Sequence, residues 1–239
     1  MQTTARARGM GNVSTSIAGD PDGSLPGASQ GVRVYEWIRD RIIDGRLATG
    51  SRVREREVAE RLKVSRVPIR EAFPRLEAEG YIRTVPHRGA IVAPLELDDV
   101  IELFDVRASL ETLAARLAAA RCAAGVSGER LSEALSTAAR ALSAEDGAGL
   151  ADATSDFHDV LVELAGSRLL QDLMLPVRGR VKRLFHLTNT QDDQDLHHEH
   201  AELCDAVRKG QVERAAALAL AHVERSRVET MQILFPSDT

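Results

Sequence analysis

Apolar residues recur at helical spacing along most of the chain, and one segment alternates instead. The first 29 residues are rich in Gly, Ser, Thr and Ala without an apolar face, so we expect a disordered tail at 1–29. The pattern then predicts a helix at 32–45, a short helix at 55–63, a helix at 65–80 and a β-hairpin at 81–94. Three helices followed by a two-stranded wing describe a winged helix-turn-helix module at 30–94.

Beyond a linker at 95–97 the pattern is helical throughout. The predicted helices span about 98–122, 127–143, 147–165, 167–189, 193–208 and 211–232. In the first of them, 3-4 spacing predicts a core-facing stripe of Leu103, Val106, Leu110, Leu113 and Leu117. The expected fold class is therefore mainly α: an N-terminal winged helix-turn-helix, an all-α six-helix bundle at 98–233, and a tail at 234–239.

The third predicted helix separates two kinds of side chain. Its packing face is apolar, whereas Arg70 and Pro74 point away from that face. Ser65 is the expected N-cap, and Arg66 follows it at the helix tip. Pro74 cannot donate a backbone hydrogen bond inside a helix, so we expect a bend or an early end near residues 70–74.

Charge divides the chain into the same two parts. Residues 31–93 hold 14 basic against 9 acidic residues, whereas residues 94–239 hold 15 basic against 25 acidic residues. A basic module suits a polyanion, and a DNA duplex carries one negative charge per ~1.7 Å of its axis. Arginine can also read guanine in the major groove. We therefore expect the module to bind double-stranded DNA; the alternative is an ordinary solvated face.

Composition indicates a helical protein of the cell interior. Hydrophobic residues make up 44% of the chain and aromatic residues only 3%, as expected of a core packed with Ala and Leu. No apolar run approaches the ~18 residues that span a bilayer. The N-terminus lacks the apolar stretch of a signal peptide. Two cysteines, Cys122 and Cys204, are too few for a disulfide framework. We expect a cytoplasmic protein with free thiols and no membrane partner.

Histidines on three different bundle helices form a candidate metal site. They lie on or beside apolar faces, and they are His158, His200 and His222. Inward imidazoles can converge on a divalent ion. The alternative is that each is a satisfied core or interface residue. His197 and His198 are expected to face solvent, and His186 has no assigned role.

Two arginines are candidates for binding an effector. Arg107 and Arg180 border or lie within apolar faces of their predicted helices. A buried guanidinium needs an anion, because an unpaired buried charge is costly. One or both could clamp a small organic carboxylate beside the histidines. The alternative is an arginine in a dimer interface or one paired with a nearby Glu.

The segment EREVAERLKVSRVPIREAFPRLEAEGYIRTVPHRGAIVAPL closely resembles the DNA-binding domain of the GntR family of bacterial transcription regulators. The turn, the arginine spacing, LEAEG and the wing glycine are all in register. The resemblance implies DNA contacts at Arg56, Ser65, Arg66, Val67, Arg70, Arg88 and Gly89. The family usually has Thr where this chain has Val67, which removes one hydroxyl contact.

The segments FHDVLVELAGS and EHAELCDAVRKGQVERAAALALAHV resemble the FCD effector-binding domain of the FadR subfamily. Many such domains hold zinc or nickel through Asp-x-x-x-His and two later histidines, which map onto His158, His200 and His222. The aspartate position falls on Thr154, a weak and neutral ligand. A water or the effector's carboxylate could fill that gap.

Together these features predict a homodimeric, ligand-responsive transcription regulator and no enzyme. We expect a repressor of a metabolic operon that reads inverted half-sites and senses a small carboxylate, with Zn or Ni as a possible cofactor. Three alternatives stay open: a metal-free regulator with a histidine-lined pocket, a metal-dependent hydrolase or lyase, and an architectural DNA binder without a ligand. Against the enzyme, Asp156 and Glu199 point to different helical sides, and neither is expected as a general base beside the histidines.

Overall fold

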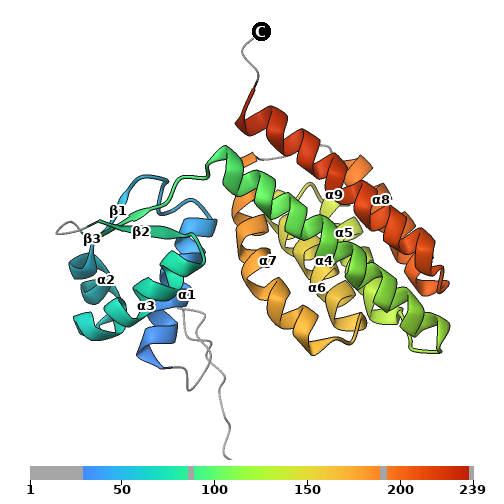
Figure 1. The fold of residues 1–239 in the computed structure, drawn as a ribbon, viewed down its shortest axis with the longest axis horizontal. Helices are drawn as coiled ribbons and strands as arrows, with labels where there is room; N and C mark the ends of the chain where they lie inside the picture. Colours follow the sequence, from blue (N-terminus) through green and yellow to red (C-terminus); the bar gives the residue numbers. More distant parts are fainter. Residues whose placement is uncertain (1–28, 86–88, 189–192, 237–239) are drawn as a thin grey trace, which may run out of the picture.

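The computed structural model describes residues 29–85, 89–188 and 193–236. Residues 1–28 of the predicted tail lie outside the described residues. Arg88 at the hairpin tip also lies outside them. A smaller N-terminal module lies beside a larger helical bundle (Figure 1). Within the described ranges, no helix has the length and apolar character needed to cross a membrane.

Three helices and a small sheet make up the N-terminal module. Its elements are α1 (Gln30–Ile43), β1 (Arg52–Val53), α2 (Glu55–Leu62), α3 (Arg66–Ala78), β2 (Ile82–Val85) and β3 (Gly89–Val92). The hydroxyl of Ser29 caps α1 by accepting the backbone N–H of Val32 at 3.3 Å. Each helix turns apolar residues into one shared core with the sheet, so the winged helix-turn-helix prediction is confirmed.

The hairpin prediction is confirmed, and one further strand extends it. β2 and β3 pair antiparallel, and β1 pairs with the other edge of β3, giving the order β1-β3-β2. The central position of β3 accounts for the burial of Ala90 and Val92. β1 has two residues, which is too short for an alternating pattern to reveal.

Helix α3 does not end at its proline. It continues through Pro74 to Ala78, so the expectation of an early end is wrong. Phe73 and Leu76 are both buried, one on each side of Pro74. This packing holds the last turn of the helix in place despite the missing backbone donor. A bend at this position stays a prediction.

Within the described residues, six helices form the C-terminal bundle, as the pattern predicted. They are α4 (Leu97–Ala123), α5 (Glu129–Ser143), α6 (Gly147–Leu164), α7 (Arg168–Thr188), α8 (Asp193–Arg208) and α9 (Val212–Leu234). The most extensive contact between two helices joins α4 and α9, which run side by side in Figure 1 (green and red). Buried alanines on both helices allow this close approach: Ala114, Ala115, Ala118 and Ala119 on α4, and Ala215, Ala216 and Ala219 on α9.

The predicted core stripe of α4 is wrong in part. Leu103 is buried, but Val106 and Leu113 are 43% and 42% exposed. The face that α4 buries instead carries small alanines together with Arg107 and Glu111. Helical spacing alone gave the leucine side as the inner one, whereas the alanines of α4 pack in one core with those of α9.

The N-terminal module packs on α7 of the bundle. α1 contacts α7, and the imidazole of His186 approaches Gly45 at the end of α1. At Gly179 the two parts come so close that an added Cβ would overlap the hydroxyl of Tyr81. One face of α7 therefore serves as the docking surface of the module.

Candidate functional site

The candidate DNA-contact residues of α2 and α3 are exposed. Arg56 lies on α2, and Arg66, Val67 and Arg70 lie on α3, all with exposed side chains. Ser65 takes the N-cap position of α3 with extended backbone, but its hydroxyl makes no capping hydrogen bond. That exposed hydroxyl can therefore bind a ligand such as a phosphate.

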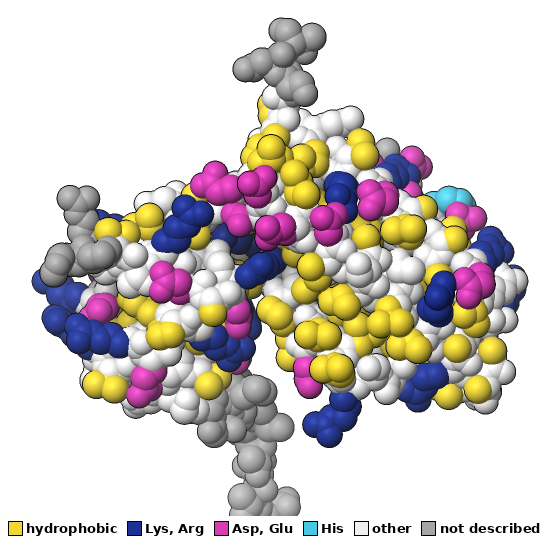
Figure 2. Space-filling model, viewed as in Figure 1, with side chains coloured by type: hydrophobic (Ala, Val, Ile, Leu, Met, Phe, Trp, Pro, Cys, Tyr) yellow, Lys and Arg dark blue, Asp and Glu magenta, His cyan; other side chains and the backbone are white. Residues whose placement is uncertain are grey.

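The wing holds one further described candidate, Gly89. Gly89 is exposed and has φ +81°, a left-handed conformation that glycine adopts without strain. In Figure 2, basic side chains gather along the outer edge of the N-terminal module. Positive charge gathered in this way suits a polyanion such as a DNA duplex.

Acidic residues hold two of the arginines in place. Nε of Arg70 lies 3.2 Å from Oε1 of Glu55, at the start of α2. Nε of Arg56 lies 3.3 Å from Oε1 of Glu60, one turn further along the same helix. The pairs are exposed and contribute little to stability, but they restrict the directions in which the guanidinium groups point.

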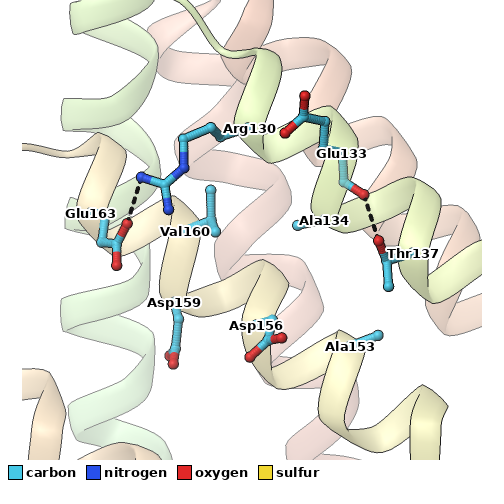
Figure 3. Close-up of a pocket in the computed structure, with 9 residues that line it drawn as sticks. All are labelled: Arg130, Glu133, Ala134, Thr137, Ala153, Asp156, Asp159, Val160 and Glu163. Atoms are coloured by element: carbon cyan, nitrogen blue, oxygen red, sulfur yellow. Dashed lines mark hydrogen bonds and ion pairs between the residues drawn. The ribbon is translucent and has the colours of Figure 1, made fainter. Parts of the chain in front are cut away.

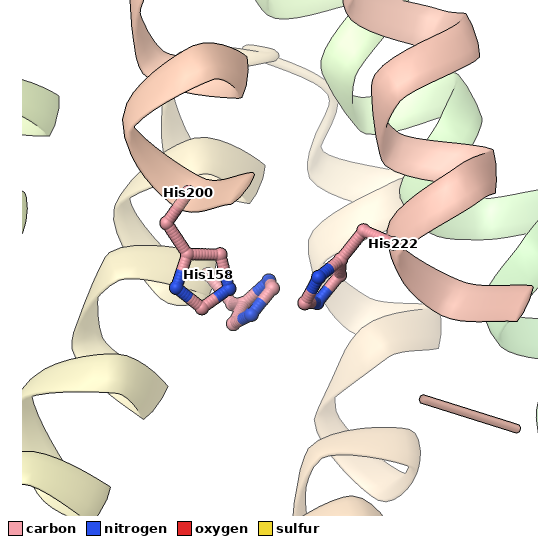
Figure 4. A group of neighbouring side chains, drawn as sticks. All are labelled: His158, His200 and His222. Carbon is pink, nitrogen blue, oxygen red and sulfur yellow. The ribbon is translucent and has the colours of Figure 1, made fainter. Parts of the chain in front are cut away.

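The structure brings the three predicted histidines together inside the bundle. His158 comes from α6, His200 from α8 and His222 from α9, and their rings converge in Figure 4. One ring nitrogen of each lies within 4.8 Å of the other two. His200 and His222 are buried, and the side chain of His158 is 20% exposed. Helices far apart in sequence thus present three imidazoles to one point.

Burial favours the neutral form of two of these imidazoles, His158 and His200. It lowers the pKa of His158 to about 4, although the carboxylate of Glu111 acts in the opposite direction. Burial and the neighbouring imidazoles also lower the pKa of His200 well below its usual value. Neutral imidazole is the form that binds a metal ion. The Nε2 atom of His200 is buried and has no hydrogen-bond partner among the described residues, so the group fits a missing ligand.

A carboxylate that the sequence reasoning set aside supports this cluster. Oε2 of Glu199 lies 3.0 Å from Nδ1 of His222, and Oε1 of Glu199 accepts from Arg225 at 2.8 Å. The expectation that Glu199 would not lie beside the histidines is wrong. Nothing in the sequence indicated this contact, because Glu199 lies on α8 and its partner His222 lies on α9. A proton on Nδ1 of His222 leaves Nε2 free as a ligand atom.

Arg107 and Glu111 form a buried ion pair next to the histidines. Arg107 is 1% exposed, and its Nε donates to Oε1 of Glu111 at 2.8 Å. Oε2 of Glu111 lies 3.7 Å from Nδ1 of His158. Burial disfavours the charge of Glu111, but the guanidinium of Arg107 and the neighbouring imidazoles together outweigh this effect, and the pKa of the carboxyl is lowered. The pairing with a nearby Glu, left open for Arg107, is the one found.

Arg180 lies elsewhere. Its Nε donates to the backbone oxygen of Glu79 at 3.0 Å, at the C-terminal end of α3. The expectation that Arg180 clamps an effector beside the histidines does not match this contact. On a helical wheel Arg180 lies among leucines, which suggested a buried apolar face. Two of these leucines, Leu173 and Leu187, are 49% and 42% exposed. The N-terminal module covers this side of α7, which no single-helix pattern can reveal.

The remaining predicted positions are placed as follows. Thr154 is half-buried on α6, one turn before His158. His198 is exposed as expected, whereas His197 is half-buried. Cys122 and Cys204 are free thiols.

A separate surface groove runs between α5 and α6 (Figure 3). Its volume is about 400 Å³, and its charged lining residues are Arg130, Glu133, Asp156, Asp159 and Glu163. Arg130 pairs with Glu163 across it at 2.9 Å. None of the three clustered histidines lines this groove.

Comparison with known proteins agrees with both parts of the fold. The model of "Bacterial regulatory proteins, gntR family" matches residues 30–92, and that of the FCD domain matches residues 102–225. The chain is 28% identical over 191 residues to the Nta operon transcriptional regulator of Aminobacter aminovorans, an alignment covering 77% of this chain and 87% of that protein. Over 87 residues it is 41% identical to a probable D-xylose utilization operon transcriptional repressor of Paenarthrobacter nicotinovorans, covering 36% and 38% of the two chains.

Solved structures give the same result. A GntR transcriptional regulator from Rhodococcus sp. RHA1 superimposes with a TM-score of 0.70 at 27% identity, covering 85% of this chain and 98% of that one. McbR/YncC of E. coli gives 0.71 at 18% identity, with 86% and 98% covered, which supports the fold alone.

A winged helix-turn-helix with exposed arginines, joined to an FCD-type helical bundle, defines a DNA-binding transcription regulator. The chain belongs to the GntR family of bacterial regulatory proteins, and its FCD domain fits the FadR-like subfamily. The relatives and fold neighbours described above are regulators and not enzymes.

Proposed function

We propose that this regulator is a homodimeric, cytoplasmic repressor whose bundle senses a small organic carboxylate through a divalent metal ion. One observation carries the proposal: three imidazoles meet inside the bundle, and the buried Nε2 of His200 lacks a partner among the described residues. The Paenarthrobacter relative, a probable transcriptional repressor, supports the direction of regulation.

The residues present fit zinc or nickel. His158, His200 and His222 would supply three nitrogen ligands, and Glu199 would orient the ring of His222. A bound ion would supply positive charge and open coordination positions for an oxygen ligand. Because Thr154 stands at the expected aspartate position, the ligand set carries no negative charge of its own.

This charge balance favours an anionic effector. The charge of Arg107 is already balanced by Glu111, so neither residue neutralises a metal ion at the histidines. A carboxylate from outside would supply the missing negative oxygen. Ser226 and Thr230 add buried hydroxyls on the face of α9 that carries His222, and Oγ1 of Thr230 has no hydrogen-bond partner among the described residues. Polar atoms of this kind suit a ligand with several oxygens.

The exposed apolar residues of the bundle support a second copy of the chain as partner. Figure 2 shows apolar side chains gathered over the face of the bundle that is turned to the viewer. Exposed apolar residues on the helices of the bundle include Val106 and Leu113 on α4, and Leu169 and Leu173 on α7. A two-fold dimer would bury a patch of this kind and would match an inverted-repeat operator.

Helix α7 offers a physical route from the histidines to DNA. On one side, Arg178 pairs with Asp159, the residue that follows His158 on α6. On the other side, the buried Arg183 donates to the backbone oxygens of Gly80 and Ala93, at the two ends of the hairpin segment. A shift of α6 on effector binding would therefore reach the end of α3 through α7. Coupling of this kind typically amounts to about 1–3 kcal/mol.

A metal titration tests the sensing site. The purified protein is expected to bind Zn²⁺ or Ni²⁺, and Glu199→Gln is expected to weaken that binding by about 10–100-fold, because the amide holds the ring of His222 less well. Isothermal titration calorimetry measures the affinity, with His200→Ala as the reference that lacks a ligand.

Equal metal affinity in wild type and His200→Ala would contradict the site. Carboxylate binding in the complete absence of metal would instead support the metal-free regulator with a histidine-lined pocket.

A variant of α7 tests the coupling route. Arg183→Met keeps the length of the side chain but removes its donors to Gly80 and Ala93. We expect metal affinity to stay unchanged while the effect of metal and carboxylate on DNA affinity shrinks several-fold. Fluorescence anisotropy with labelled operator DNA measures both states. Arg168→Met, an exposed position at the start of the same helix, is the control. An undiminished effect in Arg183→Met would contradict the route.

A further inference from the structure

Val67 is an apolar side chain in an unexpected place. It is 63% exposed, and of the large hydrophobic residues in the described ranges only Leu169 is more exposed. It lies in the first turn of α3 directly after Arg66, which is also exposed. Nothing in the core of the N-terminal module depends on it, because Val67 is absent from the residues that form that core.

The face of α3 that carries Val67 is the one opposite the core. The helix buries Ile69, Ala72, Phe73 and Leu76, whereas Val67 and Arg70 lie three residues apart on the outer side. Glu55 holds the Arg70 guanidinium at 3.2 Å. The outer face therefore presents two methyl groups between two arginines.

A DNA major groove has one apolar feature that such methyl groups can recognise. Each base pair shows hydrogen-bond donors and acceptors there, and only thymine adds a 5-methyl group. The N-terminal residues of a recognition helix are the ones that reach base edges. A valine at that point can neither donate nor accept a hydrogen bond.

We propose that Val67 is a specificity-determining residue that contacts the 5-methyl group of one thymine in each half-site. The flanking Arg66 and Arg70 supply the charge and the polar contacts, and Val67 selects the base. This inference rests on the proposal that the exposed candidate residues of α2 and α3 contact DNA.

The test removes the methyl group from the DNA and from the protein in turn. Duplexes that bind the full-length protein are first selected in vitro from a randomised pool. Each thymine of the selected sequence is then replaced singly by deoxyuridine, which lacks only the 5-methyl group. Affinities are measured for wild type, for Val67→Ser, which loses both methyl groups, and for Val67→Thr, which keeps one.

Wild type is expected to lose about fourfold in affinity at one thymine per half-site, as follows from exposing one buried methyl-sized group. Val67→Ser should bind the original duplex more weakly and lose nothing further with deoxyuridine at that position. Val67→Thr should keep most of the sensitivity. Because Val67 is exposed, all three proteins are expected to fold alike.

Two results would overturn the inference: a wild type that is indifferent to deoxyuridine at every thymine, or a Val67→Ser variant as sensitive as wild type. Failure to enrich any duplex would refute DNA contact by α2 and α3, and the inference with it. The outcomes are distinguishable because only the last one removes DNA binding altogether.

Discussion

Arg66→Ala is expected to weaken operator binding by about 30-fold or more. A good bidentate contact from arginine to a base contributes about 1–3 kcal/mol, and a two-fold dimer loses it in both half-sites. Arg66 is exposed at the N-terminal tip of α3, beside the free Ser65 hydroxyl, where the helix dipole adds positive potential. Fluorescence anisotropy with a labelled duplex measures the effect.

The control for Arg66→Ala is an arginine outside the N-terminal module. Arg116 on α4 is exposed and pairs with Glu213 at 2.8 Å, so Arg116→Ala removes one positive charge from the bundle. It should leave DNA affinity nearly unchanged. Equal losses in the two variants would mean that only net charge matters and that α3 reads no bases.

Arg107→Ala is expected to destabilise the protein by about 3–5 kcal/mol, because it leaves a buried carboxylate without its partner. Glu111 is 7% exposed, and Arg107 holds its charge through a bond of 2.8 Å. Urea unfolding followed by circular dichroism measures the loss, provided that the m-value is unchanged.

The double variant Arg107→Met with Glu111→Leu is the matched comparison. It removes both charges and keeps similar volumes, so most of the lost stability should return. A loss below about 1 kcal/mol in Arg107→Ala would contradict a desolvated pair, since exposed pairs contribute about that much or less.

The sequence predicted the elements well where periodicity is long and one-sided. The six bundle helices begin and end within a few residues of their expected positions, because each carries many turns of apolar spacing. The two-residue β1 carries too little pattern to be seen. Pro74 misled the prediction in another way, since tertiary packing by Phe73 and Leu76 outweighs one missing hydrogen bond.

Some residues of the candidate site could be predicted from the sequence, and others could not. The histidine positions could be predicted, because the resemblance to FCD domains and their placement on apolar faces agreed. Glu199 could not, since its contact with His222 depends on how α8 and α9 pack. Arg180 was assigned to the wrong partner because a helical wheel shows that a face is covered but not what covers it. Here the cover is the end of α3.

The most direct test of this account is equilibrium binding of the wild-type protein to a duplex from its own upstream region, measured at increasing salt. The account predicts a clear shift at low ionic strength and a linear fall of log affinity with log salt, with a slope set by the phosphates that the basic module contacts. No binding to any upstream fragment at low ionic strength would contradict it.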